Sequence, residues 1–263
     1  MAPISREELW EEWGGLDRWW DAIYRWRRCI AVAYAEDIAS WIIDAIGDIR
    51  LNDKGLREKT FWVGHYGQAQ LNDSDCETEE KLLCRAAFNQ RHIEGLGVAM
   101  DYELPLNKTR KARHGDIDLL CLRENELLCI EAKTFRSSES VLKGLLEAFV
   151  YTRLLNARRE QLLKDFCLDL RGISLRPVFL TFSDATSCRQ LANLPEDSSI
   201  PRLIRELDRV LAREKIKPIE LRCGHAGGAC EGKKWRRLPF HGDYKLICFK
   251  PCVTLTTTLL SIE

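Results

Sequence analysis

Outside a short polar turn at residues 123–126, the stretch 115–133 carries three carboxylates and one ammonium group on two apolar runs. Asp116 and Asp118 lie near the start of one apolar run, and Glu131 and Lys133 close a second apolar run. Two such runs joined by a short polar segment are typical of a β-hairpin. Because side chains alternate between the two faces of a strand, each charged pair shares one face. Burying these charges would be costly unless they bind something, so the hairpin is a candidate site.

Paired carboxylates on adjacent strands suit the binding of a divalent metal ion. Mg²⁺ takes oxygen ligands and is commonly held by one or two carboxylates together with water and phosphate oxygens. Asp118 and Glu131 would supply the carboxylates, and the ammonium group of Lys133 would stabilise negative charge that develops nearby. Asp116 either assists Asp118 or only begins the strand. The alternative for the whole hairpin is an ordinary surface whose charges are directed at water.

The same residues resemble a known family. Asp118, followed thirteen positions later by Glu131-Ala132-Lys133, resembles the PD-(D/E)xK nuclease superfamily, which has the restriction-endonuclease-like fold. The proline of that motif is missing, because Ile117 precedes Asp118. The resemblance implies a metal-dependent nuclease, an endonuclease or an exonuclease, that hydrolyses phosphodiester bonds with Mg²⁺ or Mn²⁺ as cofactor. It assigns Asp118, Glu131 and the Ala132 carbonyl to the metal and Lys133 to catalysis.

Helices on either side of the hairpin carry further candidate residues. In families of this kind the preceding helix, here expected over residues 75–92, supplies one more catalytic carboxylate that also holds metal. Glu80 is the first choice for it and Glu79 the second. In the following helix, Glu147 and Tyr151 resemble a Gln-x-x-x-Tyr motif of exonuclease-like branches but depart from it at the first position. Glu147 either reaches the metal site or lies on a solvated helix face.

Basic residues close to the hairpin indicate a polyanionic partner, with DNA favoured over RNA. Lysine and arginine contacts with phosphates supply most of the non-specific affinity for nucleic acids, and an aromatic side chain can stack on a base. A second basic group flanks Trp235. Solvated loops are the alternative for both groups. The candidate nucleic-acid-binding residues are Lys108, Arg110, Lys111, Arg113, Lys143 and Tyr151.

The predicted fold class is α/β, a restriction-endonuclease-like core with a central mixed β-sheet flanked by helices and a Trp-rich helical N-terminal extension. Apolar periodicity predicts a helix and three strands, with the hairpin as the second and third strands. Pro177 favours an edge or a bulge for the strand that contains it. The other expected elements are a strand over 98–106, a helix over 141–166, a strand over 173–182, a helix over 200–214, and short strands over 217–221 and 246–249.

The domain prediction has a helical extension over residues 1–50, a linker over 51–74 and an α/β domain over 75–263. The nuclease-like core is expected over 75–182, with residues 183–263 as a C-terminal elaboration. Six of the eight tryptophans lie before residue 50. They are expected to pack on the main domain, to form a homodimer interface, or to dock DNA or a partner protein. The alternative function is a catalytically inactive or partner-activated nucleic-acid-binding or assembly subunit of the same fold, in a defence or transposition system.

Composition excludes several classes of protein. The formal net charge is zero, with 40 basic and 40 acidic residues, which argues against coating nucleic acid by bulk charge. No apolar run approaches the ~20 residues that a membrane span needs, and the chain does not start with a signal-peptide pattern. A cytoplasmic protein with no membrane partner is expected, whose 11 cysteines are mostly reduced core residues. A zinc site built from the late cysteines and His225 is the alternative.

Overall fold

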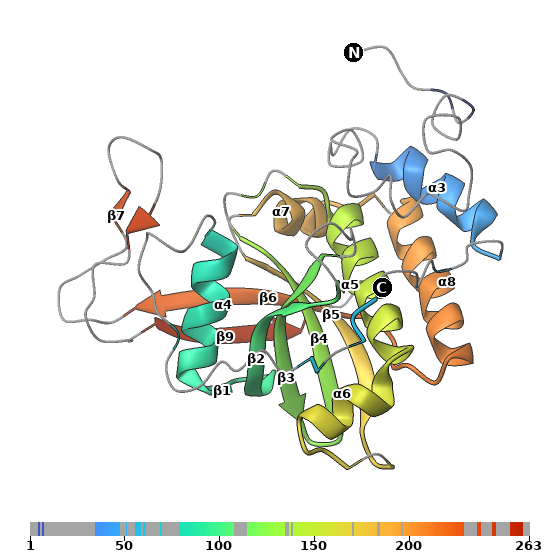
Figure 1. Ribbon diagram of the computed structural model, residues 1–263. Coiled ribbons are helices and arrows are strands. Elements are labelled where there is room, and N and C mark those ends of the chain that lie inside the picture. Colours follow the sequence, from blue (N-terminus) through green and yellow to red (C-terminus); the bar gives the residue numbers. More distant parts are fainter. Residues whose placement is uncertain are drawn as a thin grey trace.

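The centre of the molecule is a mixed β-sheet of six longer strands with a two-residue strand at one edge (Figure 1). The computed structural model describes residues 5, 7, 35–47, 51, 56–58, 60–61, 69, 79–107, 115–134, 137, 139–169, 171–182, 185–195, 197–228, 236–237, 244–245 and 253–259. The strands of this sheet are β1 (His92–Ile93), β2 (Gly97–Pro105), β3 (Asp116–Arg123), β4 (Glu126–Lys133), β5 (Ser174–Phe182), β6 (Glu220–Gly228) and β9 (Val253–Leu259).

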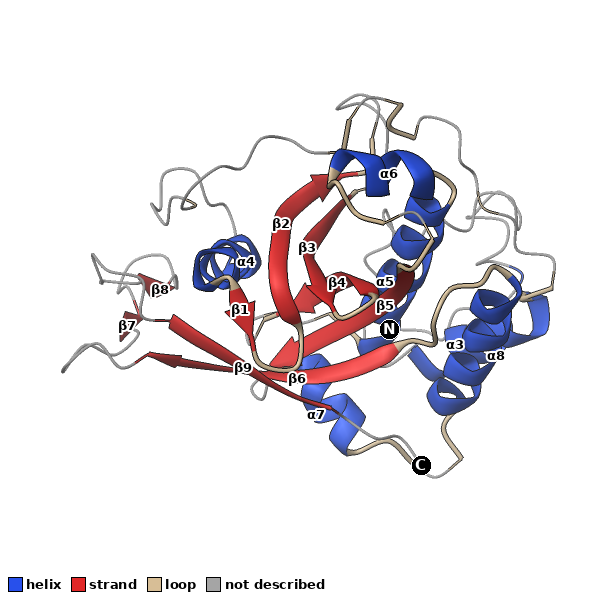
Figure 2. Ribbon diagram, turned by 90° about the horizontal axis from the view of Figure 1, so that it is seen from below, coloured by secondary structure: helices blue, strands red, loops and turns tan. Residues whose placement is uncertain are grey.

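The strands follow the order β1-β2-β3-β4-β5-β6-β9 across the sheet. β4, β5 and β6 run parallel to one another, and the remaining neighbours are antiparallel. The sheet curls so that its two edge strands, β1 and β9, approach each other (Figure 2). The short strands β7 (Arg236–Arg237) and β8 (Tyr244–Lys245) pair separately.

Helices pack on both faces of the sheet and bury two hydrophobic cores. α5 (Val141–Asn156) covers β4 and β5, and it packs with α8 (Ser199–Arg213) and α3 (Ala35–Ala45) in the larger core. α4 (Glu79–Gln90) covers β2 and β3 and closes the smaller core. The short helices α6 (Arg159–Asp165) and α7 (Thr186–Ala192) follow α5 and β5. α4 and α5 therefore lie on opposite faces, and the strands between them are covered on both sides.

Close contact of α5 with the sheet depends on Gly144. A Cβ atom at this position would lie 2.1 Å from Cε2 of Phe179, far inside van der Waals distance. Phe179 is fully buried in the larger core and belongs to β5. The missing side chain lets the first turns of α5 lie against β5, so the helix start is held next to the carboxyl ends of β4 and β5.

The elements expected around the hairpin are confirmed, with differences further along the chain. The helix expected over 141–166 is two helices, because the N–H of Arg158 donates to the Leu155 carbonyl in a tighter turn that ends α5. This turn redirects the chain so that Leu162 and Leu163 of α6 are buried in the larger core. The last expected strand, 246–249, lies outside the described residues. The strand expected over 217–221 is β6, which begins later, at Glu220, and runs on to Gly228.

Pro177 lies in an interior strand, contrary to the expectation of an edge. It pairs with Cys129 of β4 on one side. On the other side, pairing of β5 with β6 begins only at the next residue, Val178, opposite Glu220. The missing N–H of proline therefore costs no ladder hydrogen bond with β6, and the strand tolerates it.

Described parts of the N-terminal extension and of the linker pack into the larger core. Ile38 and Ile42 of α3 are buried there, and Trp41 packs against it. In the segment expected to be a linker, Leu56 and Phe61 are also buried in this core. The N–H of Phe61 donates to Oδ2 of Asp165 at 2.6 Å. The other tryptophans of the extension lie outside the described residues.

Two expectations from composition can be compared with the structure directly. Cys84, Cys121 and Cys129 are buried and unpaired, as core thiols should be. Among the described residues, no helix combines the length and apolarity that crossing a membrane requires.

Candidate active site

Asp118 lies where β3 and β4 separate. The last paired residues of the two strands are Leu119 and Ile130. One residue further, Asp118 Oδ2 accepts the N–H of Ala132 at 2.8 Å. The side chain thus takes the place of a main-chain acceptor, and this bond directs the carboxylate toward the end of β4.

The strand pair β2–β3 is irregular at the same level, which corrects the predicted pattern of faces. Strict alternation would put Ile117 on one face with Leu119 and Cys121, yet Ile117 packs in the larger core and the other two pack in the smaller one. Opposite this point, Glu103 has a positive φ of 47°. Leu104, the partner of Ile117, also faces the larger core, and Tyr102, the partner of Leu119, faces the smaller one, so both strands change face at the level of Asp118.

Glu131 and Lys133 of β4 form a buried ion pair. Each is 4% exposed. Lys133 Nζ donates to Glu131 Oε1 at 2.7 Å, and it lies 3.0 Å from Oε2 of both Glu139 and Glu147. One ammonium group is therefore shared by three carboxylates.

The start of α5 supplies two of these carboxylates and a second ammonium group. Ser140 caps the helix by accepting the N–H of Lys143. Glu139 precedes the cap, and Lys143 forms ion pairs with Glu139 and, at 3.3 Å, with Glu147. Residues 139, 143 and 147 recur every four positions, so they line one helix face directed at the end of β4.

Glu80, at the start of α4, completes the group from the other side of the sheet. Burial raises the pKa of its carboxyl, with Glu139 and Glu147 adding to the rise and Lys133 opposing it. Glu80 is thus an electrostatic neighbour of the cluster, and its choice as the helix ligand stays a prediction. The side chain of Glu79 lies outside the described residues.

These residues, called the carboxylate cluster below, are Glu80, Asp118, Glu131, Glu139 and Glu147 with Lys133 and Lys143. If all were ionised, five carboxylates would face two ammonium groups, an excess of three negative charges. Asp118 and Glu80 are half-buried, whereas Glu131 and Glu147 are fully buried. The cluster therefore has a closed end on β4 and α5 and an end open to solvent on β3 and α4.

The excess of negative charge shifts the pKa values of the carboxyl and ammonium groups in the cluster. Burial and the nearby Glu80 raise the pKa of Asp118 to about 7, although Lys133 and the Ala132 N–H oppose the rise. Burial and Asp118 hold the pKa of Glu131 well above its ordinary value. Burial alone would lower the pKa of Lys133, but Glu131 and Glu147 raise it strongly. The pKa of Glu147 is lowered instead, because the attraction of Lys133 and Lys143 outweighs the effect of burial, which would raise it.

The chemistry of the cluster fits a divalent cation. Glu131 Oε2 is buried and receives no hydrogen bond from the described part of the chain. Carboxylate oxygens whose pKa values are raised by mutual repulsion are stabilised when a cation joins them. In the described residues, however, no three acidic, histidine or cysteine side chains converge as a complete ligand set. The fit is therefore that of a two-carboxylate site on Asp118 and Glu131, and metal binding at Glu131 competes with its ion pair to Lys133.

Other candidate residues lie apart from the cluster or outside the described residues. Asp116 is exposed, and the charges that act on its raised pKa, after burial, are Lys81, Glu103 and Arg57. It begins β3 and does not join Asp118. Tyr151 is buried in the larger core, a position that does not favour contact with a nucleic acid. The basic residues over 108–114 lie outside the described residues.

Glu139 and the pairing role of Lys143 are the parts of the cluster that sequence reasoning missed. Lys143 was expected to contact nucleic acid, but its ammonium group is engaged by Glu139 and Glu147. The signal that would have found them is the spacing of Glu139, Lys143 and Glu147 by four residues across a helix start. Acidic and basic residues at this spacing form ion pairs on one helix face.

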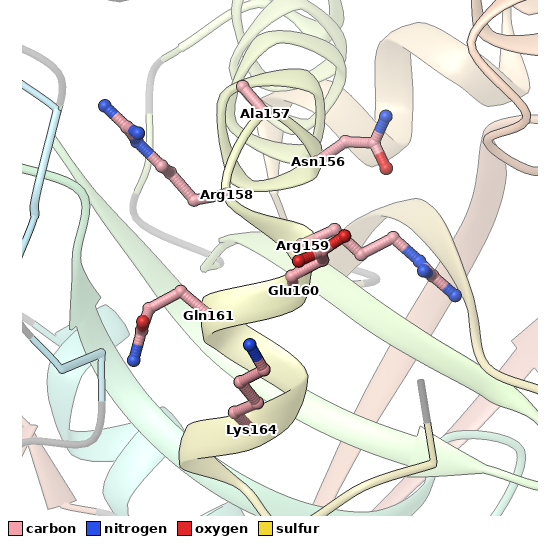
Figure 3. Close-up of a pocket in the computed structure, with 7 residues that line it drawn as sticks. All are labelled: Asn156, Ala157, Arg158, Arg159, Glu160, Gln161 and Lys164. Atoms are coloured by element: carbon pink, nitrogen blue, oxygen red, sulfur yellow. The ribbon is translucent and has the colours of Figure 1, made fainter. Parts of the chain in front are cut away.

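A pocket of about 550 Å³ lies at the turn between α5 and α6 (Figure 3). It is at the carboxyl end of α5, whereas the carboxylate cluster lies at the amino end. The pocket is thus separate from the cluster and contributes nothing to it. Its lining residues are Asn156, Ala157, Arg158, Arg159, Glu160, Gln161 and Lys164.

Comparison of the chain with protein-family models, with curated proteins and with solved structures gives no match. The α/β fold and the geometry of the carboxylate cluster are therefore the basis for assigning a function.

Proposed function

We propose that this chain is a metal-dependent nuclease of the PD-(D/E)xK type, with Mg²⁺ or Mn²⁺ as its cofactor. The observation that carries the proposal is the convergence of Asp118, Glu131 and Lys133 at the ends of adjacent strands, with an excess of negative charge around them. Asp118 of β3, Glu131 and Lys133 of β4, and Glu80 of α4 meet where the interior strands β3 and β4 end, between α4 and α5. This arrangement supports the restriction-endonuclease-like fold as the finer assignment.

Each residue has a role in phosphodiester hydrolysis under this proposal. A bound Mg²⁺ would make a water more acidic and neutralise charge on the phosphate. Asp118 and Glu131 would hold the metal, with the Ala132 carbonyl as a further ligand, and Glu80 would add negative charge beside them. Lys133 would donate hydrogen bonds to the developing phosphorane charge, and its strongly raised pKa keeps it protonated for that task. Glu147 and Glu139 would position the Lys133 ammonium group.

The substrate we propose is DNA, with access from the half-buried end of the cluster. Asp118 and Glu80 lie at this end. The basic segment 108–114 directly precedes β3 in the chain, so contacts of its lysines and arginines with phosphates would be made near Asp118.

The second candidate function is a catalytically inactive or partner-activated subunit. One observation favours it: the Lys133 ammonium group is shared by Glu131, Glu139 and Glu147, so the position beside Glu131 is already occupied by a cation. A partner protein or a second copy joined through the N-terminal helices would then be needed to free Glu131. This candidate predicts no cleavage by the isolated chain.

The test is incubation of the purified chain with linear duplex, circular duplex and single-stranded DNA and with RNA, in Mg²⁺, in Mn²⁺ or in EDTA. Cleavage products that appear with metal and are lost with EDTA support a nuclease. Products from circular duplex DNA identify internal cleavage. No cleavage of any substrate with either metal, by a chain that is folded by circular dichroism, contradicts the first proposal and favours the second.

Matched variants locate the activity in the cluster. Lys133→Met and Glu131→Gln are expected to reduce the cleavage rate at least about 100-fold, because each removes charge stabilisation or metal binding. Lys217→Met and Asp197→Asn change exposed residues away from the cluster and serve as controls. If Lys133→Met cuts at the rate of Lys217→Met while remaining folded, the assigned mechanism is wrong.

A further inference from the structure

Two thiols outside the carboxylate cluster lie next to each other. Cys188 Sγ of α7 is 3.8 Å from Cys223 Sγ of β6, and both cysteines are free. A disulfide needs the sulfurs to approach to about 2.05 Å. Cys188 is half-buried and Cys223 is buried, so one member of the pair is accessible from outside and the other is shielded.

Cys223 lies in the same row of the sheet as Lys133. In the register of the parallel strands, Lys133 of β4 is opposite Thr181 of β5, and Thr181 is opposite Cys223 of β6. Neighbouring strands are about 4.8 Å apart. The backbone of Cys223 is therefore roughly 10 Å from that of Lys133.

α7 connects this row to the start of α5. Ser187 Oγ lies 2.6 Å from Thr181 Oγ1, which fixes the first turn of α7 on β5. Gln190 Oε1 accepts the N–H of Val141 at 2.9 Å, and Val141 is the first residue of α5. The helix that carries Cys188 thus contacts both the row with Lys133 and the helix start that presents Glu139 and Lys143.

We propose that Cys188 and Cys223 are a redox-active dithiol that a hydroperoxide converts to a disulfide, which pins α7 to β6 beside the start of α5. In a reducing setting both thiols stay free, and α7 is held only by its non-covalent contacts. This goes beyond the proposed nuclease function and does not depend on it.

The chemistry balances with a hydroperoxide as oxidant. The Cys188 sulfur attacks the outer oxygen of the hydroperoxide, the O–O bond breaks, and the thiol proton leaves with the alkoxide as an alcohol. The Cys223 sulfur then attacks the resulting sulfenic acid, the S–S bond forms, and the hydroxyl group leaves as water with the Cys223 proton. Two electrons pass from the two sulfurs to the peroxide.

The surroundings of the two thiols indicate which one attacks the hydroperoxide first. Burial and the adjacent Cys188 raise the pKa of Cys223 to about 11, so this thiol is a poor first nucleophile. Cys188 is the more accessible thiol and reacts first. Cys223, shielded from other oxidants, is placed to resolve the sulfenic acid. A small-molecule dithiol would reverse the bond by exchange.

The test is a peptide map of the full chain after treatment with hydrogen peroxide, with alkylation of the remaining thiols. A peptide pair joined through Cys188 and Cys223, absent after reduction, is the expected result. Cys188→Ser should abolish it, whereas Cys167→Ser, a change at an exposed cysteine, should leave it unchanged. If either variant fails to fold, the peptide map of the unsubstituted chain is sufficient to test the proposal.

Three outcomes would overturn the proposal. The first is Cys188 over-oxidised to sulfinic acid while Cys223 remains a free thiol. The second is a disulfide of either residue with another cysteine. The third is stoichiometric zinc in the purified chain that both thiols hold.

Hydrogen exchange tests the link to α5: the Val141 amide should exchange more slowly after oxidation, and unchanged exchange contradicts the link. Neither readout uses nuclease activity.

Discussion

At the scale of single residues, the carboxylate cluster is held by opposing electrostatic effects. Burial and mutual repulsion work against ionisation of Asp118 and Glu131, and the shared Lys133 ammonium group works for it. A protein that needed only stability would gain by replacing such charges with apolar side chains. Retaining them is what a site that binds a cation and phosphate requires.

Asp118→Asn is expected to raise the melting temperature in EDTA at pH 8. The folded-state pKa of Asp118 is about 7, above the value of about 3.9 in an unfolded chain. The proton therefore stabilises the folded state most below pH 4, and this contribution is lost as the pH rises through 7. An uncharged amide avoids that loss. The measurement is thermal unfolding by circular dichroism between pH 5 and 8, where the variant should also show a shallower slope.

The same melting temperatures are then measured with Mg²⁺ in place of EDTA. Mg²⁺ should raise the melting temperature of the parent chain at pH 8, because ionised carboxylates bind it. It should leave Asp118→Asn nearly unchanged, while the exposed control Asp197→Asn behaves as the parent does. Equal shifts by Mg²⁺ in all three proteins would place the metal elsewhere.

At the scale of elements, the cluster depends on how closely α5 approaches the sheet. The first turns of α5 carry Lys143 and Glu147, and Gly144 between them lies against Phe179 of β5. A helix displaced outward would carry both side chains away from Lys133. The packing of one glycine and one phenylalanine thus sets the geometry of the charged group.

Gly144→Ala is expected to destabilise the fold although alanine favours helix formation. The gain in helix propensity is about 1 kcal/mol, and forcing a methyl group into a packed core costs typically about 1–3 kcal/mol. The required overlap with Phe179 is severe, so the cost should win and lower the melting temperature by several degrees. Gly172→Ala is the control, because among the described residues its Cβ would meet only Asp169 Oδ2, at 3.4 Å. A stable Gly144→Ala variant would mean that α5 does not lie this close to β5.

Local pattern predicted the elements that carry the site. Period-two alternation with a polar turn identified β3 and β4, and Asp118, Glu131 and Lys133 were found from it. The break after α5 could not be predicted, because the apolar stripe continues through it into Leu162 and Leu163. β9 was missed although its Val-Thr-Leu-Thr-Thr-Thr-Leu sequence, residues 253–259, is rich in β-branched residues.

Contacts between residues far apart in the chain could not be predicted from the sequence. Ile117 and its partner Leu104 face the other core than the preceding pair of β2 and β3, and this change, beside the positive φ of Glu103, depends on strand pairing and not on local pattern. The sharing of Lys133 among three carboxylates depends on the position of α5 over β4. Neither is encoded in the spacing of residues along one strand.

At the scale of the whole molecule, the described part of the N-terminal extension belongs to the main structure. Ser198 caps α8, and Glu36 of α3 accepts hydrogen bonds from the Ser198 hydroxyl and the Ser199 N–H at 2.5 Å. Ile38 and Ile42 are buried with Leu203 and other residues of the larger core. α3 therefore stabilises the α8 side of the domain that carries the cluster.

Ile42→Ala is expected to lower the stability of the entire domain by about 2–5 kcal/mol, because it leaves a cavity in the shared core. Urea unfolding followed by tryptophan fluorescence and by circular dichroism should show one coincident transition at lower urea. Ser40→Ala, at a partly exposed position of the same helix, should have little effect. A separate early transition in Ile42→Ala, with the main one unmoved, would show that α3 folds independently.

The most direct test of the proposed chemistry is the single-turnover rate of DNA cleavage at saturating Mg²⁺ for the parent chain, Lys133→Met and the exposed control Lys217→Met. The proposal predicts metal-dependent cleavage by the parent and by Lys217→Met at equal rates, with a loss of at least about 100-fold in Lys133→Met. Equal rates in all three folded proteins would contradict a catalytic role for Lys133 and with it the proposed site.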